Sequence, residues 1–534
     1  MSQSSATLPA SKPGALERAV ILGLTAVFVT YFISSFVMQT QGVAAPRMAA
    51  DLNGMPLYSW GIAIPALASA IATLIFGKLS DMYGRRLILA VCMVLFFVGS
   101  LMAALSQTFV FLIGARFVQA LGMGALAPLS FAVIGDLFNP VERSKWSGLL
   151  NIPAGICALI GPTLGGWLTD NLSWRWLFWI ALPMAVISFV LVIIGVPALT
   201  NKAKHKIDFL GGLMMIVASA TMIVGFSWGG VTYPWASIQV IGMLAFSVAV
   251  WAAFIWYEGR VEEPLLDPQV LTNRVFITAA VAGFMSFFGL LGIMMYYPLF
   301  LQGVQGISAT LSGSIITPFG VLMAFMGVPA GMLLAKTKRY KWMFIAGYGL
   351  LAAAMFGVWT FSQTTPIWLG ITITALAGLG LGAIPTINTL VVQFALPKRL
   401  MGIAIGAIFF FVMMGMAIAP AILGSFMNST YASTLQAALP AALTTKLDAA
   451  TLGSLMDSRV LLTPPAMAAL ETAVGDAALF QQTIAAIRGA LEASLKSVYL
   501  IGAITMVISF LLILTIPEVS MDAEVQEKKG NGKK

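Results

Sequence analysis

One short polar run between two apolar stretches carries the residues with the clearest chemistry. Its two glycines and three charged residues are Gly77, Asp81, Gly84, Arg85 and Arg86. The Asp81 carboxylate can interact with a helix N-terminus, and the Arg85 guanidinium can bind a carboxylate through two parallel hydrogen bonds. Asp136, at the end of a later apolar stretch, is the expected partner of Arg85. The pattern therefore predicts a conformational contact between helix ends, and not a catalytic centre.

Polar side chains inside apolar stretches form a second group of candidates. They are Gln39, Gln41, Arg116, Gln119 and Asn388. Such side chains are expensive to bury in an apolar stretch and usually face a cavity or a partner. We interpret Arg116 as a cavity residue whose charge favours anionic ligands; the alternative is an arginine that extends to an aqueous interface. For the four amides, hydrogen bonds between helices are as good an interpretation as a cavity lining.

The composition excludes several classes of protein. Of the 534 residues, 59% are hydrophobic and only 9% are charged, whereas soluble domains carry about 25% charged residues. A soluble enzyme or a nucleic-acid-binding protein could not build its surface from so few charges. Cys92 and Cys157 lie in apolar stretches, and His205 is the single histidine, so the sequence predicts neither a metal site nor a cofactor.

The elements that position these residues are predicted to be membrane-spanning helices, each of which needs about 20 mostly apolar residues. Stretches without charged residues accommodate 14 such spans, six singly and eight in four longer stretches. Most of the 29 Lys and Arg residues fall on one side when both termini are placed in the cytoplasm. This distribution follows the retention of basic loops in the cytoplasm and explains the net charge of +9 without a nucleic-acid partner.

The polar run resembles the cytoplasmic loop motif of the major facilitator superfamily, in which Gly, Leu, Asp and Gly precede basic residues. Three further segments resemble family motifs. Arg116 to Gly122 resembles the motif of the fourth span, and Gly155 with Gly161-Pro162-Thr163-Leu164-Gly165-Gly166 resembles a motif of its antiporters. Trp174-Arg175-Trp176 with Phe178 resembles a signature of the fourteen-span drug:proton antiporters. A weaker echo of the loop motif occurs at Gly331, in the second half of the chain.

The resemblance implies an all-α integral membrane protein with two six-helix bundles, an inserted helix pair and a substrate cavity between the bundles. The expected parts are a cytoplasmic tail 1–17, a bundle 18–198, the inserted pair 199–274, a bundle 275–517 and a tail 518–534. It further implies a multidrug exporter of the bacterial inner membrane that exchanges a lipophilic small molecule for protons by alternating access. No enzymatic activity is expected, because no His, Ser or acidic cluster lies at one depth.

Two departures from the family pattern affect the expected substrate. The family usually places an Asp in span 1 and an Arg in span 13, where this chain has Val37 and Val412. No acidic residue lies deep in a span, whereas exporters of cations usually need one. We therefore expect neutral or anionic substrates. An importer or facilitator without proton coupling is the alternative, which the missing Asp favours and the antiporter-like glycine motif opposes.

The segment 427–494, expected on the periplasmic side, is far longer than a connection between two helices requires. Apolar residues recur at helical spacing between Ala477 and Leu491. We predict amphipathic helices here, the last continuous with span 14, that cover the outer mouth. A surface for a periplasmic adaptor or for membrane lipid is the alternative.

Overall fold

The computed structural model describes residues 13–54, 57–197, 208–230, 232–440, 443, 455 and 470–518. Within these residues, 13 helices are long and apolar enough to cross a membrane. A further pair of helical segments, bent by 42° between Gly161 and Thr163, raises the number to 14 when it is counted as one span. The bend falls at Pro162, and proline bends helices because its nitrogen cannot donate a backbone hydrogen bond. The predicted all-α membrane fold is confirmed.

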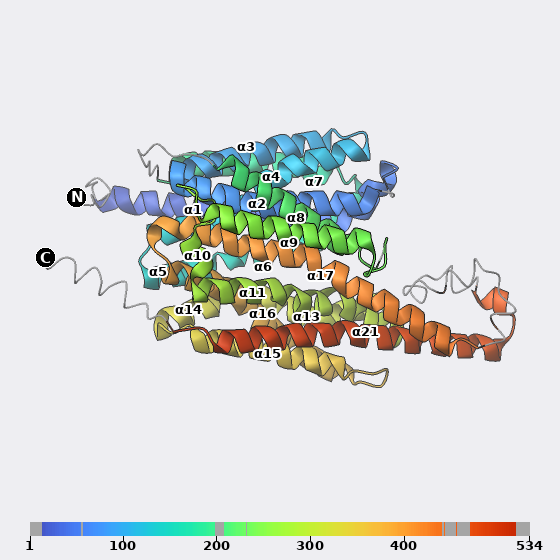
Figure 1. Cartoon of the computed structure of the whole chain (residues 1–534). Helices are drawn as coiled ribbons and strands as arrows, with labels where there is room; N and C mark the ends of the chain where they lie inside the picture. Colours follow the sequence, from blue (N-terminus) through green and yellow to red (C-terminus); the bar gives the residue numbers. More distant parts are fainter. Residues whose placement is uncertain are drawn as a thin grey trace.

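The N-terminal bundle consists of six spans that run alongside one another (Figure 1). Its helices are α1 (Pro13–Asp51), α2 (Tyr58–Tyr83), α3 (Arg85–Ala104), α4 (Phe109–Leu137), α5 (Pro140–Leu149) with α6 (Asn151–Asn171), and α7 (Trp176–Gly195). Helix α1 packs against α6 and α7, and α4 packs against α2 and α3.

The C-terminal bundle repeats this arrangement, with π-helical turns between residues 292 and 304 that extend its first span. Its helices are α11 (Arg274–Leu291), α12 (Tyr297–Leu299), α13 (Ala309–Phe325) with α14 (Gly327–Thr337), α15 (Lys341–Trp359), α16 (Ile367–Ala395), α17 (Met401–Ala438) and α21 (Ala477–Leu514). Helix α17 packs against α11 and α21, and it also packs against α2 of the N-terminal bundle.

The inserted pair comprises α8 (Phe209–Trp228) and α9 (Ile238–Glu258), followed by the short α10 (Pro268–Thr272). The side chains of Asp208 and Ser237 accept hydrogen bonds from backbone N–H groups in the first turns of α8 and α9, so these polar residues set where the helices begin. Helix α8 packs against α2 and α17, one helix from each bundle. The pair therefore lies along the seam between the bundles.

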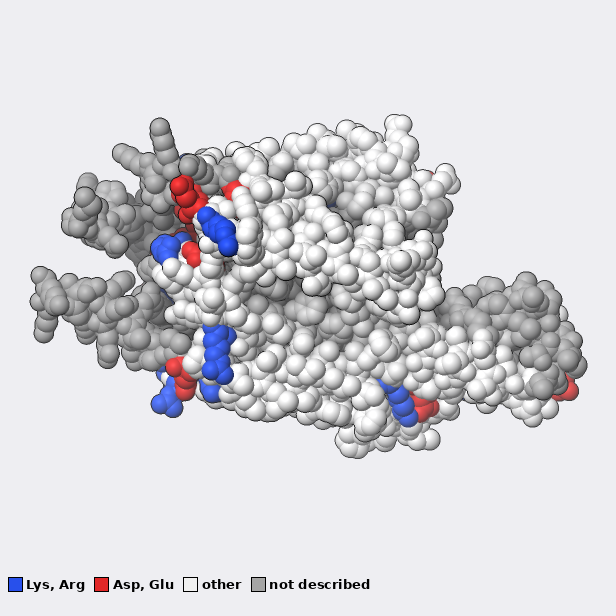
Figure 2. All heavy atoms as spheres, viewed as in Figure 1, with Lys and Arg blue, Asp and Glu red and all other residues white. Residues whose placement is uncertain are grey.

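Charged side chains are concentrated at one end of the helices. In Figure 2, most of the Lys, Arg, Asp and Glu on this face lie at the left, where α5, α10 and α14 lie in Figure 1, and the middle is almost free of charge. We call this the charged end, and the opposite side the hairpin end. An uncharged band between polar ends is the pattern expected of a protein that spans a bilayer.

Helices α17 and α21 have 38 residues each. At 1.5 Å per residue each is roughly 57 Å long, well beyond the roughly 30 Å hydrocarbon core of a bilayer. Figure 1 shows both helices continuing together past the ends of the others. The prediction that the last helix is continuous with span 14 is confirmed, but the predicted cover of the outer mouth is wrong for the described helices, because they project away from it.

The apolar positions predicted along the start of α21 are only partly buried. Ile484, Ile487 and Leu491 are buried in the core of the C-terminal bundle, whereas Ala477 and Ala478 are exposed. Tyr431 in α17 donates a hydrogen bond of 2.9 Å to the carbonyl oxygen of Leu455, so the core continues into the projecting part. The larger apolar side chains are therefore covered by the chain itself.

Candidate functional site

The charged residues of the loop motif meet at the contact between the bundles. Arg85 forms ion pairs with Asp81 (Nη2 to Oδ1, 2.6 Å) and with Asp136 (Nε to Oδ2, 2.9 Å). The Asp81 carboxylate also accepts hydrogen bonds from the backbone N–H groups of Gly402 (3.1 Å) and Ile403 (2.8 Å). We call these five residues the inter-bundle cluster. It connects α2, α3 and α4 of one bundle to the first turn of α17 in the other.

Local sequence explains how the cluster forms. Gly84, with φ of 93°, separates α2 from α3 in a conformation that residues with a side chain resist. This turn places Arg85 four residues after Asp81, and Arg85 is almost fully buried. The first turn of α17 presents unpaired N–H groups and the positive end of a helix dipole to the Asp81 carboxylate. Arg86 follows in α3 and is half-buried.

Glycine residues allow the bundles to approach closely beside the cluster. A Cβ atom on Gly77 would lie 2.7 Å from the carbonyl oxygen of Gly402, so only hydrogen fits there. The echo in the second half makes the corresponding contact. A Cβ atom on Gly331 in α14 would lie 2.9 Å from Cα of Gly148 in α5. The two loop motifs therefore each contact the opposite bundle at the charged end.

A cavity of about 250 Å³ lies between the bundles. Its walls come from α1 and α6 on one side and α11, α13, α16 and α17 on the other. The polar residues that line it are Tyr31, Gln39, Asn151, Ser286, Asn388 and Thr389. The remaining lining is apolar and includes Val412, and none of the described residues that line it is charged.

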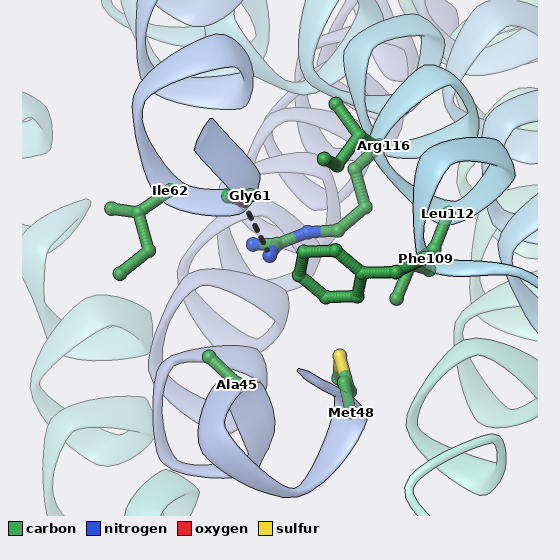
Figure 3. A pocket seen from close by; sticks show the side chains of 8 residues that line it. Ala45, Met48, Gly61, Ile62, Phe109, Leu112 and Arg116 are labelled. Carbon is green, nitrogen blue, oxygen red and sulfur yellow. Dashed lines mark hydrogen bonds between the residues drawn. The ribbon is translucent and has the colours of Figure 1, made fainter. Parts of the chain in front are cut away.

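Of the five polar candidates, the structure places Gln39 and Asn388 in this lining, and the other three elsewhere. Arg116 lies nearer the hairpin end, where its Nη1 donates a 3.0 Å hydrogen bond to the carbonyl oxygen of Gly61. Figure 3 shows its guanidinium beside Phe109 and Gly61, in a small pocket between α1, α2 and α4. The interpretation of Arg116 as a residue of the central cavity is therefore wrong, because a backbone carbonyl group between helices takes up its charge.

Gln119 and Gln41 also lie outside the lining of the cavity. The amide nitrogen of Gln119 donates a 2.9 Å hydrogen bond to Ser100 Oγ in α3. Gln41 is buried in α1 and is absent from the cavity wall. For Gln119 the alternative interpretation, a hydrogen bond between helices, describes what the structure contains.

The antiporter-like glycine motif lies at two helix contacts. A Cβ atom on Gly161 would lie 2.7 Å from Cβ of Gln39, and one on Gly165 would lie 2.8 Å from the carbonyl oxygen of Thr40. These glycines and the neighbouring Gly166 therefore belong to the close packing of α6 on α1. Gly155 instead faces the opposite bundle, where its Cβ would lie 3.0 Å from Cβ of Ala324 in α13.

Two residues at the bundle contact were not predicted from the sequence. Asn151 lines the cavity and donates a 2.8 Å hydrogen bond to Thr386 of the opposite bundle. Arg143, assigned from the sequence to a basic loop, is fully buried and lies over the Phe394 ring of α16. A polar residue at the start of an apolar stretch was a usable signal for Asn151. The burial of Arg143 depends on a helix about 250 residues later, and no local pattern encodes it.

Comparison with known proteins identifies the fold. The sequence pattern of the Major Facilitator Superfamily matches residues 27–420. The chain belongs to the major facilitator superfamily. An uncharacterized MFS-type transporter of Mycobacterium tuberculosis is 33% identical over 386 residues, which are 72% of this chain and 56% of that protein. The chain thus matches little more than half the length of this relative.

Two further comparisons support the superfamily assignment. The multidrug transporter protein MdtP of Bacillus subtilis is 30% identical over 78% of this chain and 77% of its own length. Among solved structures, the proton:xylose symporter XylE has a TM-score of 0.60 at 15% identity, covering 95% of this chain and 97% of its own. The predicted family is confirmed, and the chain is a transporter of this superfamily rather than an enzyme.

Proposed function

We propose that this transporter exports uncharged lipophilic small molecules by alternating access. The observation that carries the proposal is the cavity between the bundles, whose described lining is apolar with a few amide and hydroxyl groups. Binding sites for lipophilic molecules have this composition, in which a small number of polar groups orient the ligand. Export is supported by the relatives at about 30% identity that are named as multidrug transporters and efflux pumps.

The substrate is narrower than the sequence alone suggested. Arg116 was the reason to include anionic molecules, and it lies outside the cavity. Val412 lines the cavity at the position where the family usually has an arginine. A charged substrate would lose its hydration in this cavity without gaining an opposite charge. Uncharged molecules avoid this cost.

We place the charged end in the cytoplasm, with both termini, because basic loops are retained there. The described close contacts at Gly77, Asp81 and Gly331 hold the bundles together at this end. The conformation is then the outward-facing one of the cycle, in a bacterial inner membrane. Proton antiport remains our proposal, and Asp51 and Asp136 are the acidic residues near the two ends that we assign to it.

The test is an efflux panel in cells that express the full chain, with neutral, cationic and anionic fluorescent lipophiles. Asn388→Leu and Gln39→Leu should lower the export of neutral compounds severalfold, because they remove polar groups from the cavity. Gln119→Leu, the matched control, removes an amide outside the cavity and should leave the substrate profile unchanged. A profile dominated by cations, or equal effects of all three changes, would refute the proposal.

Coupling is tested separately in proteoliposomes with an imposed pH gradient. Proton antiport predicts substrate movement against its concentration when protons flow the other way. Substrate that only equilibrates would support a facilitator, and movement in the same direction as protons would support an importer.

A further inference from the structure

Two acidic residues meet at the charged end of the inserted helix pair. Asp208 precedes α8, and Glu258 is the last residue of α9. Both are buried, with only 8% of Asp208 and 1% of Glu258 exposed. Neither belongs to the cavity or to the inter-bundle cluster.

Each carboxylate has one oxygen with hydrogen-bond donors and one without. Asp208 Oδ1 accepts from Gly211 N (2.9 Å) and from the Tyr257 hydroxyl (3.1 Å). Glu258 Oε2 accepts from Leu266 N (3.1 Å). Asp208 Oδ2 and Glu258 Oε1 are both buried and have no hydrogen-bond donor.

The two oxygens without donors point into the same small space. Both lie against Gly211 in the first turn of α8, where an added Cβ atom would meet Asp208 Oδ2 and lie 2.6 Å from Glu258 Oε1. Glycine at this position leaves room for the two carboxyl groups to face each other. Two buried acceptor atoms that face each other without a donor indicate a missing positive ligand.

The charged and titratable groups around the pair do not supply that ligand. Tyr257 is a neutral donor to Asp208. Arg260, the nearest basic residue after α9, lies over the Trp256 ring at 3.8 Å and donates to the Trp256 carbonyl oxygen. Among the described residues, no Lys or Arg forms an ion pair with either acid.

We propose that Asp208 and Glu258 share a single proton and form a proton-binding site in the inserted helix pair, separate from the substrate cavity. Two carboxyl groups in one buried site cannot both ionise, and one proton between them satisfies both oxygens. The proposal depends on neither the direction nor the coupling of transport.

The position of the site connects it to the contact between the bundles. Glu258 holds the backbone of Leu266, and the next residue, Asp267, lies 3.8 Å from Arg399. Arg399 immediately precedes α17, whose first turn binds Asp81. Loss of the proton would place a second negative charge beside Leu266 and loosen this segment. An alkaline cytoplasm should therefore weaken the inter-bundle contact.

The experiment is infrared spectroscopy of the full-length protein in lipid nanodiscs, recorded across a pH series. At neutral pH, the spectrum of the wild type minus that of Glu258→Gln should contain a C=O stretching band of a protonated carboxyl group, and this band should disappear at alkaline pH. Asp208→Asn should also remove the band. Glu142→Gln, which changes an exposed acid at the same end, should leave it in place.

Thermal unfolding provides a second measurement on the wild type, which holds even where a variant fails to fold. The unfolded acids release their protons near pH 4, so at neutral pH the folded state binds one proton more. Stability therefore falls as pH rises, by at most about tenfold in the folding constant per pH unit. Absence of the band and of this dependence would overturn the proposal, as would loss of the band on adding Na⁺ or Ca²⁺ at constant pH.

Discussion

The substitution Asp81→Asn tests the inter-bundle cluster most directly, because it preserves the size of the side chain and removes its charge. Asparagine has a single acceptor oxygen, so it can retain one of the two hydrogen bonds from Gly402 and Ile403. A hydrogen bond to a charged group contributes about 1.5–3 kcal/mol, and the favourable helix-dipole interaction about 0.3–1 kcal/mol more. The closed contact at the charged end should lose roughly 2–4 kcal/mol, which shifts the equilibrium roughly 30- to 1,000-fold.

The shift can be measured as a distance between spin labels at the charged end. Lys145 in α5 and Thr337 in α14 are exposed, and their helices pack together across the bundle contact. In the wild type, pulsed electron resonance should give a short distance between the labels, whereas Asp81→Asn should add a longer one. Glu142→Gln, an acid within a single bundle, is the control and should leave the distribution unchanged. An unaltered distribution in well-folded Asp81→Asn protein would show that the cluster does not hold the bundles together.

Three further predictions concern the bundle contacts and the hairpin end. Gly77→Ala and Gly331→Ala should lengthen the same distance, because each added Cβ atom meets opposing backbone, while Gly114→Ala has free space around its Cβ and serves as control. Arg116→Ala should lower the thermal stability by about 1–3 kcal/mol and Lys should restore part of it; export of anionic and neutral compounds should fall equally, and selective loss of the anions would return Arg116 to substrate binding. Replacing 440–476 with a Gly-Ser linker should leave a monodisperse protein with full whole-cell efflux, since the large apolar side chains of α21 are covered by the chain, and impaired efflux would favour an adaptor surface.

The spans and the position of the charged run could be predicted from the sequence, because a bilayer imposes a length and an apolarity that local windows record. The pairing of Arg85 with Asp136 also followed from the rule that charges near a membrane need partners. The other acceptor interactions did not follow. Asp81 binds backbone N–H groups 321 and 322 residues further along the chain, and backbone donors leave no pattern in side-chain types.

Arg116 shows why a buried charge did not reveal its own surroundings. The sequence indicated that the guanidinium needs an acceptor, but a backbone carbonyl group and a ligand satisfy that need equally well. The carbonyl group of Gly61 becomes available because α2 and α4 pack against each other. The amides divided for the same reason: the side of a helix on which an amide lies decides between a cavity and a neighbouring helix, and a helix that is apolar on all sides gives no periodicity to distinguish them.

The two valines bear on where this transporter uses charge. Val412 lines the cavity, and Val37 is buried with Phe36 and Cys157 in the N-terminal bundle. A single arginine or aspartate at either position would be an unpaired charge in an apolar site, which costs several kcal/mol. Without them, the described charges that connect the bundles lie at the charged end, in the inter-bundle cluster, with the buried Asp208–Glu258 pair nearby. Because the cavity wall is uncharged and this end is not, pH and ionic strength should act on the equilibrium between conformations more than on the affinity for substrate.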